Sequence, residues 1–394
     1  MSSAPGLTPE VEVAAGLGWP RRVVVHPGVG WPDVPRETVG WTRDPAVVGP
    51  ARAPALLAER PASPDEETEA PRVVAARSVV DAVQAQVATE TVIPRAKGPR
   101  RARFDEEELS TPPTASDDVD VPRETAAVLP RPATTRTFVV ANQKGGVGKT
   151  TTSVNLAAGL ALGGLSVLLI DLDPQGNAST ALGVEHGSGV PGTYEVLIGG
   201  SAIHAHVVDS PEAPGLRVLP ATIDLAAAEI ELVSVVARER RLLRALEASL
   251  AQHPTDYVLL DCPPSLGLLT LNALVAASEI LIPIQCEYYA LEGVSQLMRT
   301  IGLVKGELND RLQLSTVLLT MYDGRTRLSA QVADEVRAHF PAETLPVVIP
   351  RSVRISEAPS YGRTVLTYHP DSAGAVSYLH AAQEIARRGA KENA

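Results

Sequence analysis

From residue 137 onward, short apolar runs alternate with segments in which apolar residues recur every three or four positions. Runs that are apolar at consecutive positions are typical of strands buried on both faces, and the wider spacing is typical of amphipathic helices. Strands are predicted at residues 137–142, 166–173, 216–221, 256–261, 280–285, 312–320 and 345–349. Helices are predicted at residues 151–164, 226–252, 272–279, 289–308, 329–340 and 374–388.

This alternation predicts the fold class. Buried strands separated by helices favour an α/β fold, a mostly parallel sheet with helices on both faces. Residues 134–394 are long enough for one such core, which we expect to be a single domain.

Residues 1–133 have a different character. They hold 19 of the 33 prolines and all three tryptophans, and their charges come in blocks such as "PRAKGPRRAR" and "FDEEEL". Frequent prolines interrupt helices and strands, and the sparse apolar surface does not offset the entropy of ordering. We therefore predict a low-complexity, disordered, proline-rich tail. The alternative is a docking segment for a protein partner, for example a scaffold protein. The basic block could also touch DNA, although the acidic block that follows it weakens this interpretation.

Charge and cysteine content limit the function classes. The tail holds 15 Lys+Arg and 20 Asp+Glu, and residues 134–394 hold 20 and 26, so the net charge of −11 is spread over both parts. Any nucleic-acid binding must then come from a local basic patch. Cys262 and Cys286 form no CxxC pair and favour reduced, buried thiols. The chain shows no signal peptide and no long apolar run, so we expect a soluble, cytoplasmic protein without membrane attachment.

The stretch "NQKGGVGKTT", residues 142–151, lies between a predicted strand and a predicted helix. Glycines let the backbone approach phosphates, and the helix N-terminus adds its positive dipole end. In such a loop Lys149 reaches the β- and γ-phosphates, and the Thr150 hydroxyl binds Mg²⁺. The pattern predicts a site for nucleotide phosphates and Mg²⁺.

The loop departs from the general phosphate-loop pattern, because Gln143 replaces its first glycine and Lys144 is an additional cation. This variant resembles the deviant Walker A motif of the ParA/MinD group of P-loop ATPases. The stretches "DLDPQGNAST", "LLDCPPSLGLLTLNAL", "IQCEYYALEGVSQL" and "IPRSVRISEAPSYG" resemble the chromosomal ParA (Soj-type) subfamily in particular. The resemblance covers residues 138–388 and not the tail.

The resemblance implies roles for individual residues. Lys144 would contact the phosphates bound by a second subunit, as an arginine finger does, so that ATP becomes part of a homodimer interface. Lys144, Lys149 and Asp173 would be the catalytic residues. The residues expected to contact the nucleotide are Lys144, Gly145, Gly146, Val147, Gly148, Lys149, Thr150, Thr151, Pro350 and Ser352.

Three aspartates follow predicted strands. Asp171 and Asp173 end one strand and Asp261 ends another, so we expect all three at the ligand-binding edge of the sheet. Asp261 has the position of an acid that holds Mg²⁺ through water. The resemblance implies that Asp171 supports the metal shell and that Asp173 activates the attacking water.

Arginines are frequent on predicted loops of the C-terminal third. Arginine suits phosphate contacts because its planar fork matches phosphate oxygens. The resemblance implies that Arg325 and Arg354 bind double-stranded DNA without sequence preference, and further candidates are Arg327, Arg351 and Arg363. Arg351 could contact the nucleotide instead of DNA.

The resemblance implies a chromosome or plasmid partitioning ATPase, associated with the nucleoid and stimulated by a ParB-type centromere-binding protein. A MinD-like membrane-associated regulator is the alternative, but the C-terminal stretch "YLHAAQEIARRGAKENA" has a weak apolar face for an anchor. An iron–sulfur ATPase is disfavoured because neither Cys262 nor Cys286 is suitably placed. A ligase-like biosynthetic enzyme of the same fold has no separate substrate signal.

Overall fold

The computed structural model describes residues 128–288 and 290–391. Of the predicted tail, only residues 128–133 fall within this part, and the rest of that prediction lies outside the described residues. Leu129 lies before the expected boundary at residue 134, yet its side chain is buried and packs onto Gly163. Its backbone N–H also donates to the Gly163 carbonyl at 2.9 Å.

The centre of the structure is one eight-stranded sheet with strand order β3-β4-β2-β5-β1-β6-β7-β8. All neighbouring strands are parallel except β3, which runs antiparallel to β4. The strands are β1 (Arg136–Val140), β2 (Val167–Asp171), β3 (Val208–Asp209), β4 (Leu216–Leu219), β5 (Tyr257–Asp261), β6 (Glu279–Gln285), β7 (Gln313–Tyr322) and β8 (Thr344–Pro350). The mostly parallel sheet predicted from the apolar runs is confirmed.

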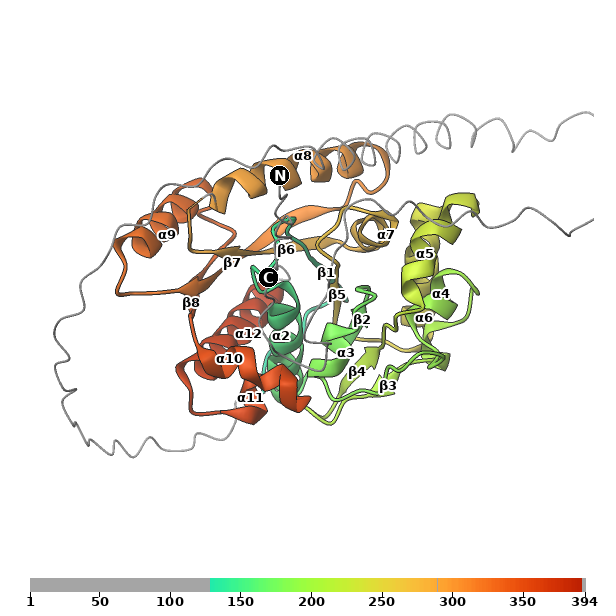
Figure 1. The fold of residues 1–394 in the computed structure, drawn as a ribbon, viewed down its shortest axis with the longest axis horizontal. Helices are drawn as coiled ribbons and strands as arrows, with labels where there is room; N and C mark the ends of the chain where they lie inside the picture. Colours follow the sequence, from blue (N-terminus) through green and yellow to red (C-terminus); the bar gives the residue numbers. More distant parts are fainter. Residues whose placement is uncertain (1–127, 289, 392–394) are drawn as a thin grey trace, which may run out of the picture. The chain divides into compact units, whose positions relative to one another are not determined.

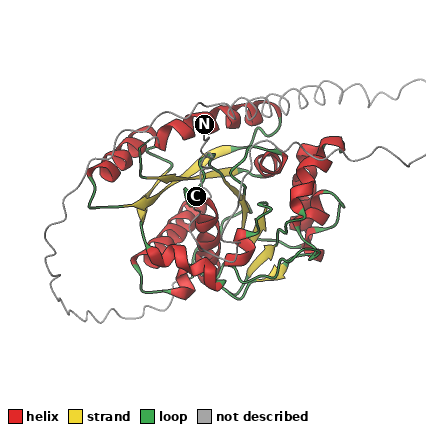
Figure 2. Cartoon of the chain, viewed as in Figure 1, coloured by secondary structure: helices red, strands yellow, loops and turns green. Residues whose placement is uncertain are grey.

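Helices cover both faces of the sheet (Figures 1 and 2). Alternate residues of each strand enter different apolar clusters, so Phe138 and Val140 pack with α2 and α12, whereas Val139 packs with α7 and α8. The helices are α2 (Lys149–Leu162), α3 (Asn177–Ala181), α4 (Thr193–Leu197), α5 (Leu225–Glu231), α6 (Arg241–Gln252), α7 (Leu268–Ala276), α8 (Ala290–Glu307), α9 (Arg327–His339), α10 (Val353–Glu357), α11 (Val365–Tyr368) and α12 (Ala373–Lys391).

One predicted helix is wrong in its extent. Residues 226–252 form two helices, α5 and α6, separated by short 3-10 turns, and Ala237 lies between them in the left-handed region at φ 51°. The stretch "LVSVV" contains three valines, and β-branched residues lose side-chain freedom in a helix. Leu232 and Leu242 are each fully buried, so tertiary packing favours a change of direction over a continuous helix.

The order of the strands positions the predicted site. β1 lies between β5 and β6, so the loop that follows β1 leaves the carboxyl edge of the sheet where the connections change direction. Val140 pairs with Asp261, and Asp261 pairs with Asp171. Three adjacent strands therefore deliver the phosphate loop and two carboxylates to the same edge.

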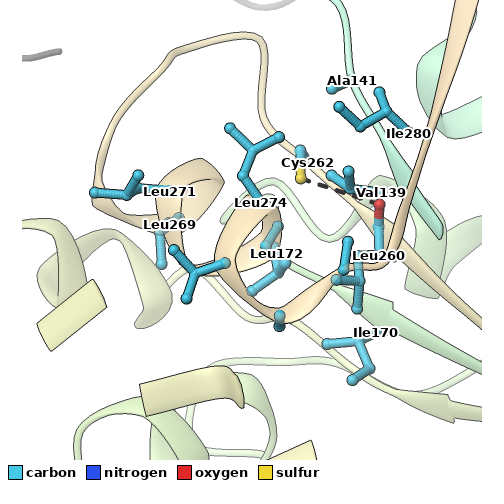
Figure 3. Packing of buried hydrophobic residues seen from close by; sticks show 14 of the residues in the cluster. Val139, Ala141, Ile170, Leu172, Leu260, Cys262, Leu269, Leu271, Leu274 and Ile280 are labelled. Carbon is cyan, nitrogen blue, oxygen red and sulfur yellow. Dashed lines mark hydrogen bonds between the residues drawn. The ribbon is translucent and has the colours of Figure 1, made fainter. Parts of the chain in front are cut away.

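Both cysteines are free and buried, as predicted. Cys262 follows β5 and lies among apolar side chains of the sheet and α7, including Val139, Leu260 and Leu274 (Figure 3). Burial raises the pKa of its thiol well above the usual value. Cys286 follows β6, and burial raises its pKa to about 11. Both thiols are therefore unreactive packing groups.

Candidate functional site

The glycine-rich loop spans the turn between β1 and α2. Gly146 and Gly148 have φ values of 75° and 88°, in the left-handed region that favours glycine. A side-chain carbon added at Gly145, Gly146 or Gly148 would meet no atom within 4 Å. The space above the loop is therefore open on the side where the backbone N–H groups and the start of α2 would receive phosphates.

Two side chains that the sequence did not single out hold this loop in place. The Asn142 amide donates to the Pro283 carbonyl at 2.9 Å, and its Oδ1 accepts the Lys144 N–H at 3.0 Å. The Thr320 hydroxyl donates to the Val147 carbonyl at 2.9 Å, and Val147 itself is buried. The loop is thus anchored to β6 and β7, two strands distant from it in sequence.

Lys149 is the first residue of α2 and is 7% exposed. Burial lowers the pKa of its ammonium group, while the nearby carboxylates of Asp261 and Asp173 act in the opposite direction. A cation in this position gains stabilisation from an anion that enters the loop.

Asp261 ends β5 and is completely buried. Its Oδ1 accepts a hydrogen bond of 2.7 Å from the Ser153 hydroxyl, whereas its Oδ2 has no hydrogen-bond partner. Burial raises the pKa of Asp261 to about 7, and the neighbouring carboxylate of Asp171 contributes to the rise. Ser153 follows Lys149 by four residues and therefore lies on the same face of α2, a spacing from which its role could have been found.

Asp171 ends β2 and is also completely buried. Its Oδ2 accepts hydrogen bonds from the backbone and the hydroxyl of Ser179, at 2.9 and 2.8 Å, and its Oδ1 accepts the Asp173 N–H at 3.1 Å. Burial raises the pKa of Asp171 to about 6, although the hydrogen bonds from Ser179 act against this. Asp173 is nearly buried and its Oδ1 accepts the Gln175 N–H at 3.0 Å, which fixes the turn that leads to α3.

These groups fit a magnesium nucleotide. The unpartnered oxygen of Asp261 and the adjacent Thr150 hydroxyl, which lowers the pKa of Asp261, are oxygen ligands of the kind Mg²⁺ prefers. Within the described part of the chain, no cluster of three or more acidic, histidine or cysteine side chains could hold a metal unaided. Substrate phosphates and water generally complete the coordination shell of Mg²⁺.

Lys144 forms its ion-pair contact with a residue outside the loop. Its ammonium group lies 3.9 Å from the carboxylate of Glu287, and Arg351 donates to the same carboxylate at 3.2 Å. Lys144 remains 38% exposed, in contrast to Lys149. Glu287 occurs in the quoted stretch "IQCEYYALEGVSQL", but the sequence gave no reason to assign it a role.

The remaining predicted nucleotide residues lie around this edge. Pro350 is the last residue of β8, and Ser352 directly precedes α10. Thr151 lies in the first turn of α2, where its carbonyl accepts a hydrogen bond from Asn155. Ser352 and Arg351 therefore leave the sheet at the same edge as the phosphate loop.

The five candidate arginines are exposed, but they differ in their contacts. Arg325 forms a two-point contact with Asp323 at 2.9 Å, which holds the pKa of that carboxyl at about 2. Arg351 also contributes to this lowering, so the loops after β7 and β8 lie side by side. Arg354, in α10, donates to the His369 ring at 2.7 Å.

The other two candidates are Arg327 and Arg363. Arg327 is the first residue of α9, and Arg363 follows a 3-10 turn that packs against α10. The structure thus brings Arg325 and Arg351 together, and it places Arg354 on α10 and Arg363 just after the 3-10 turn that packs against α10.

Comparison with known sequences places the chain among bacterial ATPases. A family model described as an AAA domain matches residues 135–314. The sporulation initiation inhibitor protein Soj of Bacillus subtilis is 52% identical over 252 residues, which is 64% of this chain and 98% of that protein. The chromosome partitioning protein ParA of Caulobacter vibrioides is 53% identical over 256 residues, covering 64% and 94% of the two chains.

Solved structures give the same picture of the fold. A cobyrinic acid a,c-diamide synthase from Mycobacterium smegmatis with bound ADP and magnesium is 40% identical, with a TM-score of 0.56 over 64% of this chain and 95% of that one. The cell division ATPase MinD of Pyrococcus furiosus is 27% identical, with a TM-score of 0.53 over 64% and 99%.

Proposed function

Because this chain belongs to the ParA/Soj family of chromosome-partitioning P-loop ATPases, which use ATP and Mg²⁺, we propose that ATP controls its dimerisation and its binding to DNA. Two ATP-bound subunits associate through their nucleotide sites and bind nucleoid DNA without sequence preference. A ParB-type centromere-binding protein stimulates hydrolysis, which separates the subunits and releases the DNA.

The observation that carries this proposal is the different placement of two lysines on one loop. Lys149 is buried beside its own carboxylates, whereas Lys144 is partly exposed and directed to the surface carboxylate of Glu287. Lys149 contacts the phosphates that are bound by its own loop, so Lys144 can contact the phosphates that are bound by a second subunit. A cation from another chain stabilises the charge on the transferring phosphoryl group.

The carboxylates supply the chemistry around the nucleotide. When bound, Mg²⁺ would supply positive charge that stabilises the phosphates during hydrolysis. Asp261 and Thr150 would hold the metal, and Asp171, which contacts Ser179 and Asp173, would support this side of the site. Asp173 orients the attacking water from the turn after β2.

Replacing Lys144 with alanine tests the pairing. We expect nucleotide binding to be largely retained and ATP-dependent dimers to be lost, as measured by light scattering after size exclusion. Lys305→Ala, in the last turn of α8, is the matched control and should dimerise normally. Normal dimers of the Lys144 variant would refute the role of this lysine.

Replacing Asp173 with alanine tests the hydrolytic step. The variant should bind ATP, hydrolyse it very slowly and accumulate as a dimer, because the loop and the metal ligands are unchanged. Phosphate release at the wild-type rate would remove Asp173 from the mechanism.

Replacing Arg354 with glutamate tests the DNA surface. Dimers should form as before, while DNA retention at moderate salt should be lost, because phosphate contacts carry most non-specific affinity. Arg387→Glu, on the exposed side of α12, is the control. The assay compares ATP, ADP and no nucleotide, with and without the centromere-binding partner, and unchanged retention by the Arg354 variant would count against this surface.

The MinD-like alternative needs a membrane anchor. The apolar face of α12 is instead buried against α2 and β8, through Tyr378, Ala382 and Ile385. Among the described helices, none is long and apolar enough to cross a bilayer. Co-sedimentation with anionic vesicles in the presence of ATP would support the alternative, and its absence would favour partitioning.

The likeness to a cobyrinic acid a,c-diamide synthase suggests a second alternative, a biosynthetic ligase. This function requires a substrate that accelerates ATP hydrolysis. Incubation with cobyrinic acid and glutamine distinguishes the two, because a partitioning ATPase responds to DNA and its protein partner and not to these compounds.

A further inference from the structure

A pocket of about 280 Å³ lies between α6 and the segment formed by α4 and the turn after it. None of the residues proposed above to bind nucleotide or DNA lines it. The residues that line it combine apolar side chains, such as Ala202 and Ala248, with polar and cationic ones, such as Arg241, Arg244, Ser249 and Gln252. No acidic residue is among them, although the chain carries a net charge of −11.

Two arginines provide positive charge to this pocket. Arg241 is fixed by donating to the carbonyls of Leu197 and Ile198 at 2.8 and 3.0 Å, which leaves the other N–H groups of its guanidinium available. Arg244 follows three residues later, so it lies on the same face of α6. Within the described part of the chain, neither arginine forms an ion pair.

Further donors surround these cations. Ser249 is 6% exposed, and among the described residues its hydroxyl has no hydrogen-bond partner. Gln252 lines the same side of the pocket, and the His204 ring packs at 5.2 Å from that of His253. A pocket that is lined by two cations and several hydrogen-bond donors, and by no carboxylate, is suited to a carboxylate or another anion.

We propose that this pocket binds the chain's own acidic segment "FDEEEL", residues 104–109. The segment combines four carboxylates with Phe104 and Leu109, which match the cationic rim and the exposed apolar lining that Ala202 and Ala248 provide. The proposal is independent of the partitioning function, and docking here leaves the phosphate loop uncovered.

The place where the chain joins the core supports this occupant. Arg131 pairs with Asp256 at 3.4 Å, and the Thr135 hydroxyl donates to the Thr255 carbonyl at 2.7 Å. Thr255 and Asp256 lie in the short loop that follows α6. The last residue of α6, Gln252, lines the pocket. An extended chain spans about 3.3–3.6 Å per residue, so residues 110–130 can bridge roughly 70 Å, far more than this separation requires.

The basic block "PRAKGPRRAR" directly precedes the acidic segment and competes for it. Contact between two solvated runs is screened by salt and costs side-chain entropy. Arg241 is already held in position by backbone carbonyls, so the pocket offers pre-arranged donors. We therefore expect the acidic segment to bind the pocket in preference to the basic block at moderate ionic strength.

Cross-linking within the full-length protein tests the proposal. Ser110→Cys next to the acidic segment is combined with Ala248→Cys in the pocket, or with Ala338→Cys on α9 as the matched control. Both alanines are exposed, and the native cysteines are buried with raised thiol pKa values, so a short bis-maleimide reacts with the introduced pair. We expect the pocket pair to cross-link within one chain at least about tenfold faster than the control pair.

Substitutions that change charge provide a second test of the proposal. Arg244→Glu, an exposed substitution, should slow cross-linking roughly fivefold or more, and so should replacement of the four acidic residues by serine. Equal rates for the pocket and control pairs would overturn the proposal. So would cross-links that form only between chains, which would assign the pocket to a second copy, or a rate unaffected by Arg244→Glu.

Discussion

Replacing Glu287 with glutamine removes a carboxylate that Lys144 and Arg351 share. In the subunit described here, the Lys144 ammonium lies 3.9 Å from this carboxylate and the Arg351 guanidinium lies 3.2 Å from it. If Lys144 must reach a nucleotide on another subunit, it has to leave Glu287 first. The substitution should therefore favour ATP-dependent pairing.

The magnitude follows from the exposure of the pair. Lys144 is 38% exposed and Glu287 is 46% exposed, so solvent screens their attraction and each pair contributes about 0.2–1 kcal/mol. A symmetric dimer breaks two such pairs, which gives about 0.4–2 kcal/mol in total. Since about 1.4 kcal/mol is a factor of ten, the dimer dissociation constant should fall roughly 2- to 30-fold.

Analytical ultracentrifugation with ATP, in an Asp173→Ala background that slows hydrolysis, measures this constant. The effect should shrink as salt rises from 50 to 500 mM, because the contact is screened. Glu335→Gln, an exposed acid on α9, is the control. A dimer that is unchanged or weakened by Glu287→Gln would refute the reasoning, because it would mean that Glu287 does not restrain Lys144 or that it acts in the dimer itself.

Three further outcomes are expected. Burial raises the pKa of Asp261 to about 7, so in metal-free protein the unfolded chain loses this proton first and stability falls as pH rises from about 4 to about 7; Asp261→Asn should flatten the fall in melting temperature between pH 4 and 7. Glu279→Ala removes the carboxylate of a buried ion pair with Arg136 and should lower the free energy of unfolding by about 3–5 kcal/mol in urea titrations; a loss below about 1 kcal/mol would contradict this. Leu129→Ala should cost about 2 kcal/mol, whereas its exposed neighbour Val128→Ala should change little, and equal effects would show that Leu129 does not anchor the core.

Local sequence determined the parts of this protein whose chemistry depends on near neighbours. The glycines of residues 145–148 permit the left-handed turns of the loop, and the apolar runs identified all but one short strand of the sheet. Asp171 and Asp261 were placed correctly because both directly end such runs. Periodicity failed at residues 226–252, where the valines of "LVSVV" disfavour a helix and the burial of Leu232 and Leu242 favours a change of direction.

Only the tertiary structure decided which of these groups meet. Asp171 and Asp261 are neighbours because β5 pairs with β2 on one side and with β1 on the other, although the strands are far apart in sequence. Glu287 reaches Lys144 and Arg351 only because β6 lies beside β1 and β7 beside β8. Contacts of this kind depend on strand order and on burial across the whole sheet, and a pattern within one segment carries no information about them.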